Sequence, residues 1–369
     1  MSDFVDIIDQ KQIVEHMQNA LSTGKISHAY IIEGEEDAGK EFITNIFAKA
    51  IQCESKETRD GHIEACNKCH SCIQAASHSH PDIITVTHEK PATISVDDIR
   101  TQVRDDVIIK PYSSKYKIYI IPEGEKMNAA AQNALLKTLE EPPAYVIIFI
   151  LTSNLSAFLQ TIISRCIVLS MKPAMDESIK KYLMSSFHVV DYKAEVCASF
   201  ARGNVGKALE LAEDEHFENL RNNTIDLITK LSRLEIHEIN EKVQSIITPK
   251  EEEQEKPKEK ESKSKKDKDK KSDEGKKKTS KADLHVLDDF FDVLLYFFRD
   301  VLVYKAEEKT DHLIFSDKLS YIRDITDHCT YKGINHIIES LEVAQNRLRA
   351  NVNTELTLQM LFIDIKESI

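Results

Sequence analysis

The stretch that decides the fold is residues 31–44, Ile-Ile-Glu-Gly-Glu-Glu-Asp-Ala-Gly-Lys-Glu-Phe-Ile-Thr. Gly34, Gly39 and Lys40 have the spacing of the motif G-x-x-x-x-G-K-[ST], whose backbone N–H groups and helix N-terminus hold phosphate. The apolar run before Gly34 predicts a strand, and the residues after Gly39 predict an amphipathic helix through residue 52. A strand, a glycine-rich turn and a helix in this order predict a P-loop-type α/β domain.

The side chains of this loop are unfavourable for phosphate binding. Glu41 occupies the position of the Ser or Thr whose hydroxyl binds Mg²⁺, and residues 35–37 add three carboxylates where a polyanion would lie. The acid that binds Mg²⁺ after a later strand is also missing, because Pro122 follows the apolar run 116–121. We therefore expect the loop to keep its shape and to hold no nucleotide.

Apolar runs and helical patterns alternate along the first 170 residues. Continuous apolar runs are typical of strands buried on both faces of a parallel sheet, and the segments between them carry apolar residues at helical spacing. This alternation predicts a doubly wound α/β domain over residues 1–170. The expected strands are 28–34, 83–87, 116–121, 145–151 and 167–169, and the expected helices are 10–23, 39–52, 95–107 and 127–141.

The remainder of the chain predicts helices only. Residues 171–212 are expected to form a small helical domain, and residues 213–369 a larger all-helical domain with core helices at 284–305, 334–350 and 353–365. Residues 249–283 contain fourteen Lys and eleven Asp or Glu and almost no apolar side chain, which predicts a disordered charged insertion. A basic tether for nucleic acid or for a partner is the alternative.

Four of the seven cysteines, Cys53, Cys66, Cys69 and Cys72, lie within twenty residues. Their spacing, C-x12-C-x2-C-x2-C, fits four thiolate ligands around one tetrahedral zinc ion. Nearby histidines could replace one ligand, and four free thiols are the alternative. Because four protein ligands leave no open position on the metal, we expect a structural zinc site and not a catalytic one.

Charge and hydropathy narrow the classes of function. The chain has 49 basic and 62 acidic residues and a net charge of −13, which argues against binding nucleic acid through its overall charge. It has no run of 18 apolar residues that would predict a transmembrane helix, and its first residues lack the features of a signal peptide. We expect a soluble cytoplasmic protein with no membrane partner.

Several motifs occur together in this sequence: Gly24-x3-His28-Ala-Tyr, the loop, the four cysteines, His80-Pro-Asp82, Met127-Asn-x5-Ala-Leu-Leu-Lys-Thr-Leu-Glu-Glu-Pro-Pro and Ser164-Arg-Cys166. Together they resemble the bacterial clamp-loader AAA+ proteins, the subunits of the DNA polymerase III holoenzyme that place the sliding clamp on DNA. The resemblance is specific over residues 10–170, weaker over 171–250, and returns at 347–353. It implies an AAA+ parallel-sheet domain with an inserted zinc module, a helical lid domain and an all-α collar domain.

Two subunit types of this family are candidates. The tau/gamma type is the ATPase motor and has an intact loop, whereas the delta-prime type keeps the fold and has a degraded nucleotide site. Glu41, Pro122 and Gly206, which stands where the motor type has its sensor-2 arginine, favour the delta-prime type. The alternatives are an ATP-hydrolysing motor subunit and a zinc-ribbon protein that binds nucleic acid through its Lys-rich segment.

The resemblance also assigns a role to Arg165. In the family's ring, Ser164-Arg165-Cys166 offers an arginine finger to ATP in a neighbouring motor subunit, where guanidinium charge stabilises the transferring phosphoryl group. A surface arginine paired with a carboxylate is the alternative. The implied partners are motor and delta subunits in a hetero-oligomeric ring, with the sliding clamp and primed DNA contacted by the complex. No intrinsic enzymatic activity is expected of this subunit of the holoenzyme.

Overall fold

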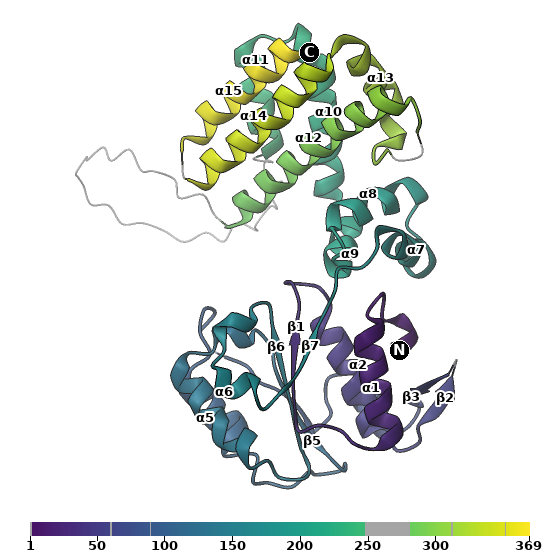
Figure 1. Cartoon of the computed structure of the whole chain (residues 1–369), viewed down its shortest axis with the longest axis vertical. Coiled ribbons are helices and arrows are strands. Elements are labelled where there is room, and N and C mark those ends of the chain that lie inside the picture. Colours follow the sequence, from purple (N-terminus) through teal and green to yellow (C-terminus); the bar gives the residue numbers. More distant parts are fainter. Residues whose placement is uncertain (1, 60, 89, 248–280, 311–312, 351) are drawn as a thin grey trace, which may run out of the picture. The chain divides into compact units, whose positions relative to one another are not determined.

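The computed structural model describes residues 2–59, 61–88, 90–247, 281–310, 313–350 and 352–369. Of the predicted insertion 249–283, residues 249–280 therefore lie outside the described residues. The chain forms two compact units, Met1–Ala212 and Glu213–Ile369 (Figure 1). The finer division of the first unit after residue 170 stays a prediction.

The first unit contains alternating strands and helices. Its strands are β1 (Ala29–Glu33), β2 (Glu57–Arg59), β3 (His62–Glu64), β4 (Ile83–Thr85), β5 (Lys117–Ile121), β6 (Val146–Thr152) and β7 (Ile167–Ser170). Its helices are α1 (Lys11–Thr23), α2 (Lys40–Gln52), α3 (His70–Ala76), α4 (Val96–Ile99), α5 (Ala129–Glu140), α6 (Gln160–Ile163), α7 (Asp176–Phe187), α8 (Asp191–Ala201) and α9 (Val205–Glu213). The helix predicted over 95–107 is α-helical only in its first turn, α4. A π-helical segment, Arg100–Arg104, follows it directly.

Five strands form one parallel sheet in the order β4-β5-β6-β1-β7. The strand that precedes the loop, β1, lies between β6 and β7, with Ala29 opposite Ile148 and Tyr30 opposite Ile167. Because the strands are parallel, the turns after β1, β5 and β6 all lie at the carboxyl edge of the sheet. Ligands bind at this edge in open α/β sheets.

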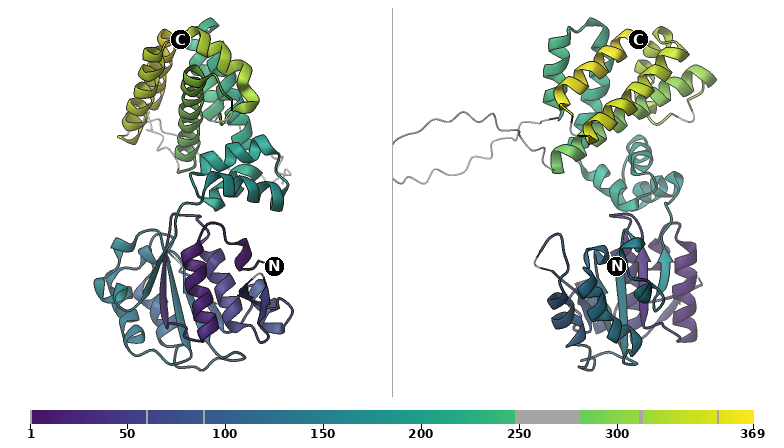
Figure 2. Two further views of the ribbon diagram at one scale, coloured as in Figure 1. Left: turned by 45° about the vertical axis from the view of Figure 1, so that its right-hand side comes forward. Right: turned by 60° about the vertical axis from the view of Figure 1, so that its left-hand side comes forward.

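Both faces of the sheet are covered by helices (Figure 2). Alternate residues of each strand point to opposite faces, so Tyr30 joins the core beneath α1 and α2 while Ile31 joins the core beneath α4 and α5. Tyr30 stacks on Phe149 with ring centroids 5.2 Å apart, and Phe47 of α2 packs edge-on against both rings. The predicted doubly wound α/β fold is confirmed.

The spacer between Cys53 and Cys66 contains strands that the sequence analysis does not predict. It contains an antiparallel hairpin of β2 and β3, which reverses at Gly61 with φ of +84°. The amide of Gln18 on α1 exchanges two hydrogen bonds with the backbone of Ile63, at 2.7 and 3.1 Å. These bonds attach the hairpin to the first helix of the unit.

The second unit is helical throughout its described residues. Its helices are α10 (Glu215–Lys230), α11 (Ile236–Ile247), α12 (Lys281–Glu307), α13 (Leu319–His328), α14 (Tyr331–Arg349) and α15 (Thr354–Ser368). Helix α12 packs against α10, α11, α13 and α14, and its Phe290 and Phe297 are fully buried. Phe290 contacts Phe362 of α15, and Phe297 contacts Phe315, each at 6.2 Å between ring centroids. The prediction of an all-helical C-terminal region is confirmed.

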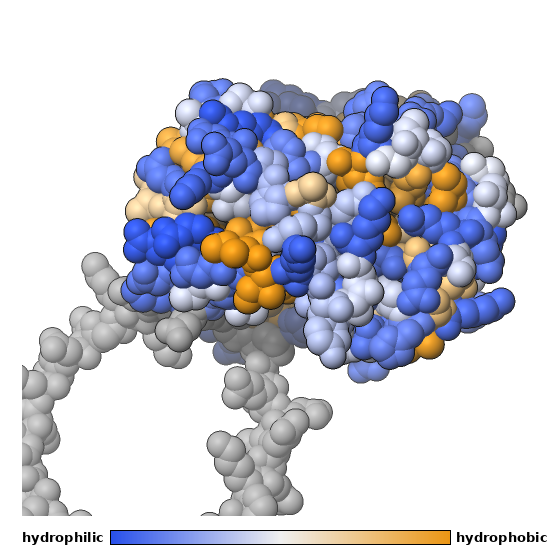
Figure 3. Space-filling model, turned by 90° about the horizontal axis from the view of Figure 1, so that it is seen from below, coloured by the Kyte–Doolittle hydropathy of each residue, from blue (hydrophilic) through white to orange (hydrophobic). Residues whose placement is uncertain are grey.

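None of the helices in the described part of the chain is long and apolar enough to cross a membrane. On the face shown in Figure 3, hydrophilic residues predominate and apolar residues form small separate patches. Scattered exposed apolar side chains of this kind are usual on folded proteins.

Candidate functional site

The turn between β1 and α2 has the backbone of a phosphate-binding loop. Asp37 (φ 58°) and Gly39 (φ 88°) are left-handed, and Gly39 directly precedes the first residue of α2. The Lys40 ammonium donates a hydrogen bond to the carbonyl oxygen of Gly34 at 2.8 Å and another to that of Glu35. The cation that would bind a phosphate is thus bonded to the loop itself.

A cavity of about 660 Å³ lies beside this loop. Among its twelve lining residues Lys40 is the one basic side chain, and six are acidic: Glu36, Asp37, Glu41, Glu123, Glu125 and Glu210. Burial lowers the pKa of Lys40, although the carboxylates around it act in the opposite direction. So many carboxylates around one ammonium disfavour a polyanion in this cavity.

The N-terminal end of α9 lies directly against the loop. The Asn204 amide donates a hydrogen bond to the carbonyl oxygen of Glu36 at 2.7 Å. A Cβ atom on Gly206 would collide with the carbonyl oxygen of Asp37. Gly206 is the residue expected where the motor type has an arginine, and this packing leaves no room there for any side chain.

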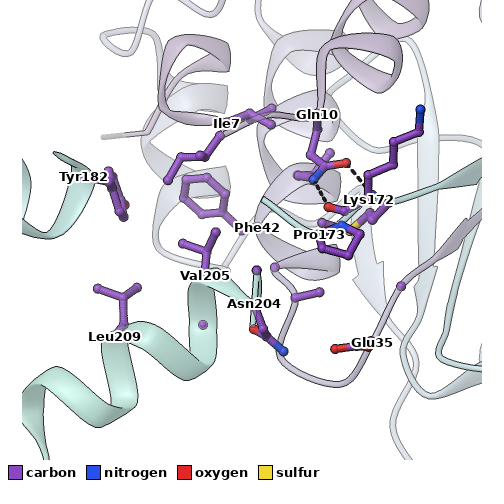
Figure 4. Close-up of a pocket in the computed structure, with 18 of the residues that line it drawn as sticks. Ile7, Gln10, Glu35, Phe42, Lys172, Pro173, Tyr182, Asn204, Val205 and Leu209 are labelled. Carbon is purple, nitrogen blue, oxygen red and sulfur yellow. Dashed lines mark hydrogen bonds between the residues drawn. The ribbon is translucent and has the colours of Figure 1, made fainter. Parts of the chain in front are cut away.

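A second cavity, also about 660 Å³, is mainly apolar and shares Gly39, Ser153 and Gly206 with the acidic one. Figure 4 shows Phe42, Tyr182 and Val205 facing this cavity from α2, α7 and α9. At its edge the Gln10 amide donates to the Lys172 carbonyl oxygen at 2.6 Å and accepts from the Lys172 N–H at 3.0 Å. Both ends of that amide are therefore bonded within the chain.

The acidic residues after β5 are held by groups of the chain. Pro122 follows the strand, as the sequence shows, and Glu123 adopts a left-handed backbone with φ of 49°. Its carboxylate pairs with Lys126 at 2.6 Å and lies 3.0 Å from His88, and these contacts, the one with Lys126 first, lower the pKa of Glu123. Glu125 accepts hydrogen bonds from two hydroxyl groups at the end of β6. Both carboxylates that follow Pro122 are therefore bonded to side chains of this chain.

Arg165 lies between α6 and β7 and lines neither of the two cavities. Its Nη2 lies 2.9 Å from Oε1 of Glu140, and its Nη1 donates to the carbonyl oxygen of Thr161 at 2.7 Å. The side chain is 34% exposed. Next to it, Ser164 donates to the Thr161 carbonyl oxygen, and burial raises the pKa of the Cys166 thiol. The sequence left two alternatives for Arg165, an arginine finger and a surface arginine paired with a carboxylate. The ion pair is present, and the arginine side chain is also partly exposed.

The structure brings the four predicted cysteines together. The sulfur atoms of Cys53, Cys66, Cys69 and Cys72 all lie within 4.8 Å of one another, so the cluster could hold a metal ion. Backbone N–H groups point at the sulfurs: Cys66 N–H donates to Cys53 Sγ, and Cys69 N–H to Cys66 Sγ, each at 3.3 Å. Hydrogen bonds from the N–H groups of Lys68 and Cys69 lower the pKa of Cys66 to about 6, which favours its thiolate form, whereas burial raises the pKa of Cys53 and of Cys72.

A buried polar network joins the cysteine cluster to the edge of the sheet. His80 Nε2 lies 3.0 Å from the hydroxyl of Ser71 on α3 and 3.2 Å from that of Ser114, while its Nδ1 accepts the Asp82 N–H. The Asp82 carboxylate accepts the three backbone N–H groups of residues 112–114. Burial alone would raise the pKa of Asp82, but these hydrogen bonds together lower it. The sequence shows the His80-Pro-Asp82 motif without indicating this role.

Fold and site together define a class of protein: a P-loop-type α/β unit with a four-cysteine module, joined to a helical bundle. The family described as "DNA polymerase III, delta subunit" matches residues 9–175, and the one described as "DNA polymerase III, delta subunit, C terminal" matches residues 278–367. The chain belongs to the family of DNA polymerase III clamp-loader subunits.

Three relatives show how the similarity is distributed. The delta' subunit of DNA polymerase III from Bacillus subtilis is 27% identical over 362 residues, which cover 97% of this chain and 96% of that protein. The gamma subunit of Buchnera aphidicola is 32% identical over 61% of each chain, and the tau subunit of Bacillus subtilis 36% identical over 57% of this chain and 37% of that protein. The chain thus spans less than two thirds of the gamma and tau subunits and nearly all of delta'.

A solved structure of a gamma-subunit-related protein from Thermotoga maritima aligns with 96% of this chain and 99% of its own length. The TM-score of that alignment is 0.42 and the identity 17%.

Asp82→Ala is expected to lower the free energy of unfolding of the first unit by about 3 kcal/mol, because it leaves buried N–H groups without their acceptor. Since the pKa of Asp82 is lowered, its carboxylate stabilises the fold above about pH 4 and loses that effect as the pH falls further. Urea unfolding of the full chain, followed by circular dichroism from pH 7 to pH 3, measures both effects.

Asp97→Ala is the matched control for this prediction, because the side chain of Asp97 is 80% exposed. We expect it to change stability by no more than about 0.5 kcal/mol. Equal stability of the Asp82 and Asp97 variants at pH 7 would show that the network does not stabilise the unit.

Proposed function

We propose that this chain is a delta-prime-type subunit of the clamp loader, which places the sliding clamp on primed DNA, and that it binds no ATP itself. One observation carries the proposal: the cavity beside the loop presents six carboxylates, and its one ammonium is bonded to the loop's own carbonyl oxygens. The nearly full-length match to a delta' subunit supports it. On this proposal the chain has no intrinsic enzymatic activity and works in the cytoplasm.

Arg165 would then act on ATP bound by a neighbouring motor subunit. The parallel pairing of β1 with β7 places Tyr30 opposite Ile167, so Arg165 precedes β7 at the amino edge of the sheet while the loop follows β1 at the carboxyl edge. Four residues of strand separate these edges by roughly 13 Å, at about 3.3 Å for each residue. An arginine at the amino edge therefore lies apart from its own loop, which suits an action in trans.

The proposed partners are the tau/gamma motor subunits and the delta subunit in a hetero-oligomeric ring. Helix α15 carries the exposed apolar residues Leu356 and Met360 at a spacing of four. Residues four apart share one face of a helix, so Leu356 and Met360 form a short apolar stripe that a neighbouring helix can cover. This stripe supports a role of the second unit in assembly. The clamp and primed DNA would be contacted by the complex as a whole.

We further propose that the four cysteines hold one structural zinc ion. Four sulfur atoms within 4.8 Å of one another can surround one ion, as the tetrahedral preference of zinc requires, and four such ligands would leave no position for a substrate. The bound ion would fix the start of α3 to the end of α2, because Cys69 caps the former and Cys53 follows the latter.

A motor-type ATPase is the second candidate, because the gamma and tau relatives have the higher sequence identities. Those alignments cover only 61% and 57% of this chain. The acidic cavity and the packing of Gly206 against the loop count against it.

The purified chain is expected to show no saturable binding of ATP with Mg²⁺ up to about 1 mM, the upper end of common Michaelis constants. The carboxylates around Lys40 are the physical reason. Isothermal titration calorimetry measures this, with a tau-type subunit as the positive control. Micromolar affinity together with Mg²⁺-dependent turnover by the chain alone would instead favour the motor-type alternative.

Arg165→Ala is expected to leave assembly intact and to slow single-turnover ATP hydrolysis at the facing site of the reconstituted complex by about tenfold or more. Arginine fingers in GTPases contribute still larger factors. Arg165→Lys should also be slow, because a lysine lacks the planar fork of a guanidinium. Rapid-quench kinetics measure the rate, and gel filtration verifies assembly. An unchanged rate in both variants would remove Arg165 from the reaction.

The purified protein is expected to contain about one zinc ion for each chain, measured by atomic emission. Cys72→Ser should lose the metal and lower the unfolding temperature, whereas Cys197→Ser should keep it, because Cys197 is outside the cluster. A metal-free protein with four titratable thiols and unchanged stability would refute the site.

A further inference from the structure

The C-terminal end of α5 carries a carboxylate in an unfavourable place. Glu140 is the last residue of α5, where the negative end of the helix dipole disfavours negative charge. Its carboxylate is nevertheless half exposed and lies 2.9 Å from the guanidinium of Arg165. A glutamate at this position does not stabilise its own helix. Its ion pair with Arg165 is therefore the interaction to which we look for its role.

Glu140 and Thr161 hold the guanidinium of Arg165 from two different elements. The Glu140 carboxylate on α5 forms an ion pair with Nη2, and the Thr161 carbonyl oxygen on α6 accepts a hydrogen bond from Nη1. A guanidinium has five N–H donors in a fixed plane, so an ion pair and a hydrogen bond from two elements restrict that plane while other N–H donors remain for another acceptor. Helices α5 and α6 pack against each other, which keeps the two acceptors at a constant separation.

We propose that Glu140 is a positioning residue that holds Arg165 ready for the nucleotide of the neighbouring subunit. This inference rests on the proposed role of Arg165 in trans. Arginine has a long side chain with large conformational freedom, and a finger that is already ordered loses less entropy when it meets the transition state. Glu140 restricts that freedom while the remaining N–H groups stay available for phosphoryl oxygens.

Glu141 provides a matched control for this test. It is the next residue in the chain and has the same chemistry, and it is exposed beyond the end of α5. Glu140→Gln and Glu141→Gln therefore change the net charge equally, and only the first removes the ion pair with Arg165.

The test uses the reconstituted complex carrying Glu140→Gln, Glu141→Gln, Arg165→Ala, or Glu140→Gln combined with Arg165→Ala. We expect Glu140→Gln to lower kcat for ATP about two- to tenfold with an unchanged KM, because the lost order matters in the transition state. Glu141→Gln should behave as the unmodified complex. In the Arg165→Ala background, Glu140→Gln should have no further effect. Gel filtration verifies equal assembly in each case.

Three results would overturn the inference, and they are distinguishable. If Arg165→Ala slows hydrolysis and Glu140→Gln does not, Glu140 has no positioning role and the proposed function stands. If Glu140→Gln accelerates hydrolysis, the ion pair slows the reaction of Arg165 and does not position it for catalysis. If Arg165→Ala has no effect, the proposed function fails and the inference fails with it.

Discussion

The hydrogen bonds from the Lys40 ammonium to the carbonyl oxygens of Gly34 and Glu35 are the interaction on which the rest of the account depends. In a loop that binds nucleotide, this ammonium lies against phosphate oxygens. Here the chain supplies the acceptors, and the carboxylates of the adjoining cavity make a competing polyanion unfavourable. The loop keeps the turn that starts α2, with Gly39 in its left-handed conformation, and lacks an available positive charge.

The parallel sheet connects this loop to the residue that we propose to act in trans. One core of aromatic and aliphatic side chains fixes β1 between β6 and β7, so the loop after β1 and Arg165 before β7 are attached to the same framework at opposite edges. The cysteine cluster is attached to the sheet as well, through His80 and Asp82. In a subunit built in this way, the sheet holds the Arg165 guanidinium in place. Its orientation would not depend on a nucleotide in the subunit's own loop.

The sequence predicts the features that rest on local patterns. Continuous apolar runs locate the strands of the sheet, the glycine spacing locates the loop, and the cysteine spacing locates a cluster that the structure brings together. The β2–β3 hairpin escapes prediction because strands of three residues carry too little periodicity. The contacts of Glu140 with Arg165 and of Asn204 with Glu36 join residues far apart in the chain, and no spacing rule connects them.

A structure of the reconstituted clamp-loader complex with a non-hydrolysable ATP analogue tests the central claim most directly. We predict that the loop between Gly34 and Lys40 holds no nucleotide. We also predict that the Arg165 guanidinium lies about 3 Å, a hydrogen-bond distance, from a γ-phosphate oxygen bound by the neighbouring subunit. Nucleotide in this chain's own loop, or an Arg165 side chain remote from every nucleotide in the ring, would contradict the account.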